Sequence, residues 1–241
     1  MESPLEQFKI KALIPLHAGG LDLSFTNSAA FMVLAIAVVT LFMTLSVRSR
    51  ELVPGRVQSV AELAYEFVAG MIKDNVGQAG RPYFPFIFTL FMFILGANLL
   101  GMVPYTFTVT SHIIVTFSMA LFVFLGVTLI ALIKHGTHFF GFFVPKGVPK
   151  ALIPLVMVIE VISYLARPVS LALRLFANMT AGHTMMKVFG SFVVMMGLAG
   201  VLPFAVLIAL TGLEIVIAFL QAYVFTVLTC LYLNDALHLH H

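Results

Sequence analysis

Long apolar runs separated by short polar segments make up most of the chain. Five of these runs are long enough for a helix to cross a membrane, because about 20 helical residues span a hydrocarbon core of about 30 Å. Backbone groups in lipid must be paired within the segment itself, so the pattern predicts an all-α integral membrane protein. The five membrane-embedded helices are expected at residues 28–47, 82–103, 113–133, 151–187 and 189–233.

The last two runs are too long for helices that stand upright in a bilayer. With a rise of about 1.5 Å per residue, they would form helices of about 55 Å and about 67 Å. Dividing either run into two spans leaves a piece that is too short or too polar. We therefore expect two long, strongly tilted helices that form a hairpin turning near Gly190.

Residues 57–76 have an amphipathic pattern in place of a continuous apolar one. Val60 and Phe67 lie on the apolar side of a helix, whereas Glu62 and Lys73 lie on the other side. Such a pattern is typical of a helix that lies in the plane of the membrane interface. We expect one surface helix here, in addition to the five membrane-embedded helices.

Positive charges at the ends of the runs predict the orientation. Arg48 and Arg50 follow the first run and Lys134 follows the third, whereas residues 104–112 contain no Lys or Arg. The positive-inside rule therefore places the surface helix and the C-terminus in the cytoplasm, and the N-terminal segment 1–27 outside.

Composition narrows the class of protein. Of the 241 residues, 61% are hydrophobic and 10% are charged, and the formal net charge is +3. This composition excludes an ordinary soluble domain, and no basic cluster with interleaved aromatic residues indicates nucleic acid. The single cysteine, Cys230, excludes an internal disulfide or a cysteine metal cluster. We expect residues 1–241 to form one membrane domain without a metal or cofactor.

A polar stripe interrupts the fourth apolar run. Its members recur every three or four residues and therefore share one face of a helix. A charged group at the centre of a bilayer costs about 2.5 to 3.5 kcal/mol on insertion scales, so a functional site is the first hypothesis and a structural ion pair the alternative. The stripe comprises Glu160, Ser163, Arg167, Ser170, Arg174 and Asn178.

The last run carries a sparser set of polar residues that includes Glu214 and Gln221. In the predicted hairpin, His183 and Glu214 would approach each other on the outer side of Arg174. Glu160 would lie about 21 Å from Arg174 along the helix, on the inner side. Titratable groups would then lie on both sides of one positive charge.

An arginine in that position has two physical consequences. A guanidinium group stays charged where a lysine could lose its proton, so protons moving through water would meet a permanent barrier. It would also lower the pKa of a carboxylate that a partner brought near it. Arg174 would thus block a leak and remove a proton from a carrier, while His183 and Glu214 would serve as a proton relay.

Several segments closely resemble subunit a of F-type ATP synthases. They are SLALRLFANMTAGH at residues 170–183, LQAYVF at 220–225, PVS at 168–170 and NLLGMVPY at 98–105. The resemblance covers nearly the whole chain. It implies a stator subunit of a rotary membrane sector that performs no ATP chemistry itself and forms two offset aqueous half-channels.

The resemblance also implies roles for individual residues. Arg174 matches the essential arginine that faces the carboxylates of a ring of c subunits and separates the half-channels. Asn98 and His112 lie near the outer surface, where a channel mouth or, for Asn98, a helix C-cap is possible. The outer half-channel would be lined by Asn178, His183, Glu214 and Gln221, and the inner half-channel by Glu160, Ser163 and Ser170.

The implied partners follow from the same family. They are the c ring at the Arg174 face, the peripheral-stalk b subunits, the other synthase subunits, membrane lipid and the protons themselves. A proton would enter from outside, neutralise a ring carboxylate and leave on the inner side after nearly a full turn. The location would be an energy-transducing membrane, and in a bacterium the inner (plasma) membrane.

Two other classes of function remain open from the residues alone. A haem-binding cytochrome subunit would be consistent with eight histidines, provided that two of them faced each other near the middle of the membrane. An independent proton-coupled transporter would be consistent with the charged stripe, although the chain lacks the repeated halves of many such carriers.

Overall fold

The computed structural model describes residues 10–15, 17–18, 21–22, 24–48, 54–103, 106–143, 149 and 152–238. Within these residues the chain is mainly helical, and short 3-10 helices lie at most of the connections. The α-helices are α1 (Asn27–Ser46), α2 (Arg56–Asn75), α3 (Phe84–Gly101), α4 (Ile113–His135), α5 (Ile153–Met195) and α6 (Val201–Leu237). The 3-10 helices are η2 (Gly77–Tyr83), η3 (Val109–Ser111), η4 (Gly136–Phe143) and η5 (Gly197–Gly200).

Short strands precede α1. They form two antiparallel pairs, because β1 (Ala12–Ile14) pairs with β4 (Phe25–Thr26) and β2 (His17–Ala18) pairs with β3 (Leu21–Asp22). The sequence pattern does not predict these strands, since segments of two or three residues are too short to show the alternation of a strand. The side chain of Thr26 then caps α1 by accepting a hydrogen bond from the Ala29 amide at 3.3 Å.

Within the described ranges, five helical segments are long and apolar enough to cross a membrane, which confirms the predicted all-α membrane class. Helices suit this environment because each one pairs its own backbone groups. Helix α2 is not among the five, in keeping with its charged residues. The candidate spans are Asn27–Ser46, Gly77–Gly101, Ile113–His135, Ile153–Met195 and Val201–Leu237.

The turn between the two long helices differs from the prediction. Helix α5 does not turn near Gly190 but continues to Met195, and the chain reverses at η5. Gly197 has a φ of 54°, a left-handed conformation that glycine adopts at little cost. A Cβ on Gly200 would lie only 2.5 Å from the Val193 carbonyl oxygen, so glycine also permits the close approach of the two helix ends.

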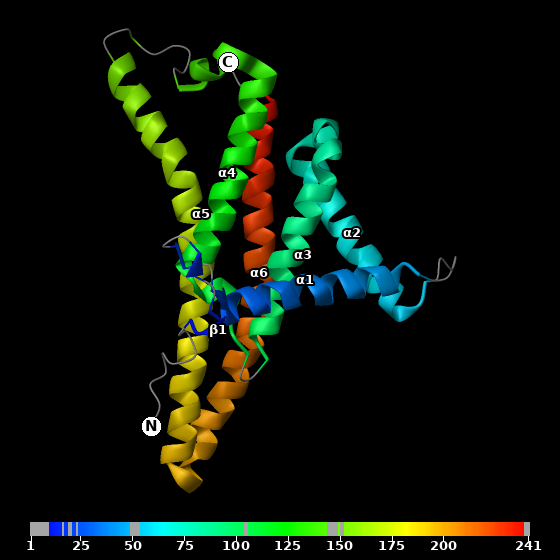
Figure 1. Cartoon of the computed structure of the whole chain (residues 1–241), viewed down its shortest axis with the longest axis vertical. Helices are drawn as coiled ribbons and strands as arrows, with labels where there is room; N and C mark the ends of the chain where they lie inside the picture. The colour runs from blue at the N-terminus through cyan, green and yellow to red at the C-terminus, as the bar shows by residue number, and fades with distance from the viewer. Residues whose placement is uncertain are drawn as a thin grey trace.

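The long helices lie side by side in the fold. Helices α4, α5 and α6 pack against one another, and α3 packs on α6 (Figure 1). Helix α2 contacts both α3 and α6. Helix α1 packs on α3 but runs across the direction of α5 and α6 (Figure 1).

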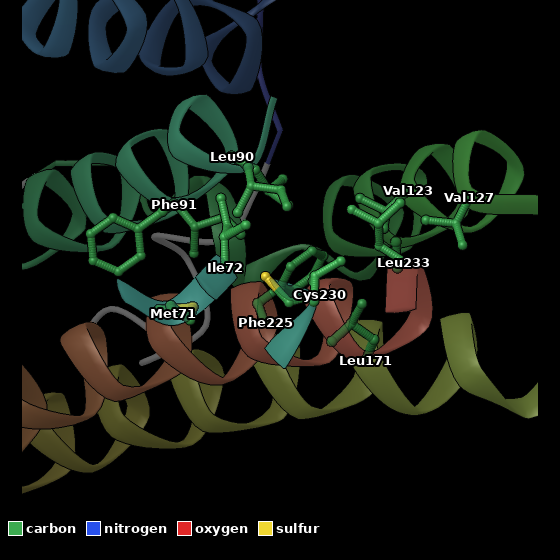
Figure 2. Packing of buried hydrophobic residues seen from close by; sticks show 14 of the residues in the cluster. Met71, Ile72, Leu90, Phe91, Val123, Val127, Leu171, Phe225, Cys230 and Leu233 are labelled. Atoms are coloured by element: carbon green, nitrogen blue, oxygen red, sulfur yellow. The ribbon is translucent and has the colours of Figure 1, made fainter. Parts of the chain in front are cut away.

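A continuous hydrophobic core joins α2 to α6. It contains Ile72, Phe91, Val123, Leu171 and Phe225, one from each of the five helices and each at most 2% exposed (Figure 2). The contribution of α5 comes from one side of that helix. The opposite side of α5 is therefore left outside the core.

Candidate functional site

The packing of α5 determines where its polar stripe lies. Leu171, Leu175 and Met179 are buried in the core. Arg174 and Asn178 lie on the other side of the same turns and are exposed. Spacing of three and four residues keeps the stripe together, so Ser163 and Ser170 are exposed as well, and Glu160 is half-buried.

Arg174 stands at the midpoint of α5. No Asp or Glu among residues 152–238 or the other described segments forms a salt bridge with it. In particular, the chain does not pair it with Glu160 or Glu214, which was the structural alternative to a functional role. The guanidinium group is therefore exposed and has no acidic partner among the described residues.

His183 and Glu214 meet across the α5–α6 hairpin. Nδ1 of His183 contacts Oε1 of Glu214, and the two side chains are only 4% and 3% exposed. Their second polar atoms, Nε2 and Oε2, have no hydrogen-bond partner among the described residues. Buried polar atoms of this kind are usually satisfied by water.

Gly182 makes room for this carboxylate. A Cβ at position 182 would lie 2.7 Å from Oε1 of Glu214 and 3.0 Å from its Cδ. The glycine therefore lets the acidic side chain lie directly against the backbone of α5. Gln221 is also buried, about two turns beyond Glu214 on α6.

Asn98 links three elements. Its Nδ2 donates to the Ala218 carbonyl of α6 at 3.1 Å, and its Oδ1 accepts from the Thr110 hydroxyl of η3 at 2.7 Å. The side chain is fully buried. These bonds run to neighbouring elements and not to the end of its own helix, so Asn98 holds the α3, α6 and η3 segments together.

His112 precedes α4 and is half-buried. Its ring stacks on Phe107, with centroids 4.8 Å apart and planes inclined by 11°. Burial lowers the pKa of the imidazole, which favours its neutral form. His112 directly follows η3, the segment that Asn98 contacts.

One close pair was missed by the sequence analysis. Nη1 of Arg167 lies 2.9 Å from Oδ2 of Asp235. In an antiparallel hairpin centred on η5, these two residues lie at similar distances from the turn. A turn near Gly190 gives a register in which neither this pair nor His183 and Glu214 would meet, whereas a turn at η5 brings both pairs together.

No cluster of three or more His, Cys, Asp or Glu side chains within the described ranges could hold a metal ion. His183 contacts the Glu214 carboxylate.

Comparison with known proteins gives one consistent result. The family model described as ATP synthase A chain matches residues 29–234. ATP synthase subunit a of Paramagnetospirillum magneticum is 61% identical over 100% of both chains. The proteins of the same name from Pelagibacter ubique and Rhodospirillum rubrum are 55% and 54% identical, over 99% and 100% of each chain.

Proposed function

The chain belongs to the ATP synthase subunit a family, and from this we propose that it moves protons onto and off a ring of c subunits through two offset half-channels. As a member of that family it is a proton-translocating, multi-pass membrane subunit that assembles with other ATP synthase subunits. In our proposal the ATP chemistry takes place on those other subunits, and the peripheral-stalk b subunits hold this chain still.

The observation that carries the proposal is that Arg174 is exposed and has no acidic partner among the described residues. A permanent cation in the middle of an apolar helix is costly in lipid, so it requires a counter-charge. The described residues offer it none, and a carboxylate on a ring subunit would supply one. Such a carboxylate would be held ionised beside the guanidinium, because the positive charge lowers its pKa.

The outer half-channel is proposed to run past the His183–Glu214 pair towards Arg174. The pair lies nine residues and about 13 Å from Arg174, on the side of η5. Its unsatisfied buried atoms support a hydrated path there. Asn178 and Gln221 would then line the way from this pair to the arginine.

The inner half-channel is proposed to lie on the other side of Arg174. Ser170, Ser163 and Glu160 follow one another along the exposed stripe in that direction. A proton released from the ring would leave past these groups. Because Arg174 lies between the two paths and stays charged, a proton could cross only by riding on the ring.

The orientation in the membrane is also a proposal. Helix α1 has 20 residues and a length of about 30 Å, which matches a hydrocarbon core. Since α1 runs across α5 and α6 (Figure 1), an upright α1 would leave the two long helices strongly tilted. We place the N-terminus outside and the C-terminus and α2 on the cytoplasmic side of a bacterial inner membrane.

Replacing Arg174 by Ala tests the proposal. We expect proton-driven ATP synthesis in reconstituted membranes to be lost and the passive proton leak to rise, because both the barrier and the counter-charge are removed. Lys187→Ala is the matched control, since Lys187 is also an exposed cation on α5 but lies on a different face. Coupled synthesis that survives Arg174→Ala would reject the proposed role.

A further inference from the structure

A charged and aromatic cluster joins α5 and α6 at the end opposite η5. Nη1 of Arg167 lies 2.9 Å from Oδ2 of Asp235. The guanidinium carbon also lies 5.2 Å from the ring centroid of Tyr164 and 5.0 Å from that of Tyr232. Such distances are within the range of cation–π contacts. The Asp235 carboxylate and rings from both helices therefore contact Arg167.

Helix α4 fixes the partners of Arg167 in place. The Tyr164 hydroxyl is 2.6 Å from the Thr128 hydroxyl of α4. At the end of α4, Lys134 Nζ donates to the Leu237 carbonyl at 3.0 Å, and His135 Nε2 lies 3.0 Å from the Ala236 carbonyl. These groups bind the last turn of α6, where carbonyls lack partners within the helix. Asp235 stands on that anchored turn.

Arg167 and Arg174 belong to the same polar stripe. They are seven residues apart, and seven residues return to the same helix face within about 20°, with a rise of about 10.5 Å. The two guanidinium groups differ in their partners. Arg167 has a carboxylate partner from within the chain, whereas Arg174 has none among the described residues.

We propose that Asp235 masks the charge of Arg167, so that Arg174 is the cation which an incoming carboxylate of the carrier meets. This inference rests on the proposed function, in which such a carboxylate passes along the stripe. An unmasked Arg167 would offer a second attractive site about 10 Å away on the inner side. The carboxylate of the carrier could then be stabilised beside Arg167 as well as beside Arg174. Its proton would be released at either position and not at Arg174 alone. Arg167 and Asp235 are thus positioning residues.

A double-mutant cycle in the assembled complex tests this inference. Asp235→Asn removes the masking charge while keeping a side chain of the same shape that can still accept a hydrogen bond. Arg167→Gln/Asp235→Asn removes both charges. We expect Asp235→Asn to lower proton-driven ATP synthesis about tenfold per assembled complex, and the double variant to return to within about twofold of the native rate.

The rescue separates charge masking from a purely structural role. If the pair only clamps the hairpin, the double variant will be at least as impaired as Asp235→Asn, and that result would overturn the inference. A native rate for Asp235→Asn would overturn it as well. Asn234→Ala, one residue away in the same turn of α6, is the control for local disturbance and should keep the native rate.

Two further results are decisive. If Asp235→Asn does not accumulate in the membrane, Asp235→Ser takes its place. If neither variant accumulates, the pair is needed for folding and not for the carrier, and the inference fails.

Arg174→Ala is measured in the same membranes. Retained synthesis in that variant would reject the proposed function itself, whereas a failed rescue with an inactive Arg174→Ala would reject only the masking by Asp235.

Discussion

Arg174 and Glu214 are both charged residues in apolar helices, but their surroundings differ. Arg174 is exposed and has no acidic partner among the described residues, whereas Glu214 is buried and contacts His183. A buried carboxylate persists only when it is paired, hydrated or protonated. In the proposed function, Glu214 therefore holds and passes a proton within the chain, and Arg174 interacts with a group that arrives from outside.

Gly182→Ala tests how closely Glu214 must be positioned. A Cβ at 2.7 Å from Oε1 cannot be accommodated, so the carboxylate must move away from His183 or the two helices must separate. Because displacements of about 1 Å can cost about 100-fold in rate, we expect proton-driven ATP synthesis to fall about 10-fold to 100-fold in membrane vesicles.

Gly212→Ala is the matched control for this substitution. Gly212 also lies in the hairpin, on α6, but a Cβ there would meet nothing within 4 Å. The control should keep the native rate of synthesis. Equal rates in the Gly182→Ala and Gly212→Ala variants would show that the position of the carboxylate does not matter.

At the scale of elements, local spacing predicts which residues share a helix face, but it does not predict which residues of two different helices meet. The face shared by Arg174 and Asn178 follows from helical spacing alone, because both residues lie within one continuous helix. The Arg167–Asp235 contact depends on where the hairpin turns. An isolated glycine in an apolar helix, such as Gly190, is not a reliable turn signal. At the observed turn, Gly197 adopts the left-handed conformation, and Gly200 lets the backbone approach the Val193 carbonyl closely.

Alanine substitutions at Gly197 and Gly190 distinguish the two positions for the turn. Gly197 has a φ of 54°, so Gly197→Ala should destabilise the protein by about 1 to 2 kcal/mol. Gly190 lies within α5 with open space around it, and alanine there should stabilise the helix by about 0.5 to 1 kcal/mol. Thermal unfolding in detergent measures both, and the reverse order of stabilities would contradict a turn at η5.

At the scale of the whole molecule, hydropathy predicted the class of fold but not the arrangement of its helices. Helix α5 has 43 residues and α6 has 37, so they are about 64 Å and about 56 Å long, roughly twice a hydrocarbon core. The packing of α2 on α6 and the crossing of α1 (Figure 1) depend on contacts between distant segments, which no local periodicity encodes.

The proposed topology predicts that the two ends of the described chain lie on opposite sides of the membrane. Lys11 and His238 are exposed, and the native Cys230 is buried and should contribute little background. With a membrane-impermeant maleimide on right-side-out vesicles, Lys11→Cys should be labelled at once and His238→Cys only after permeabilisation. Labelling of both variants from the same side would contradict five spans.

The central claim is that a permanent positive charge stands between two aqueous paths and faces an acidic group on the rotor. A high-resolution map of the assembled complex tests this claim most directly. The account predicts that the Arg174 guanidinium lies within about 4 to 6 Å of a ring carboxylate as it passes, and that ordered water ends on either side of it. A guanidinium that points away from the ring, or a continuous water path past it, would contradict the account.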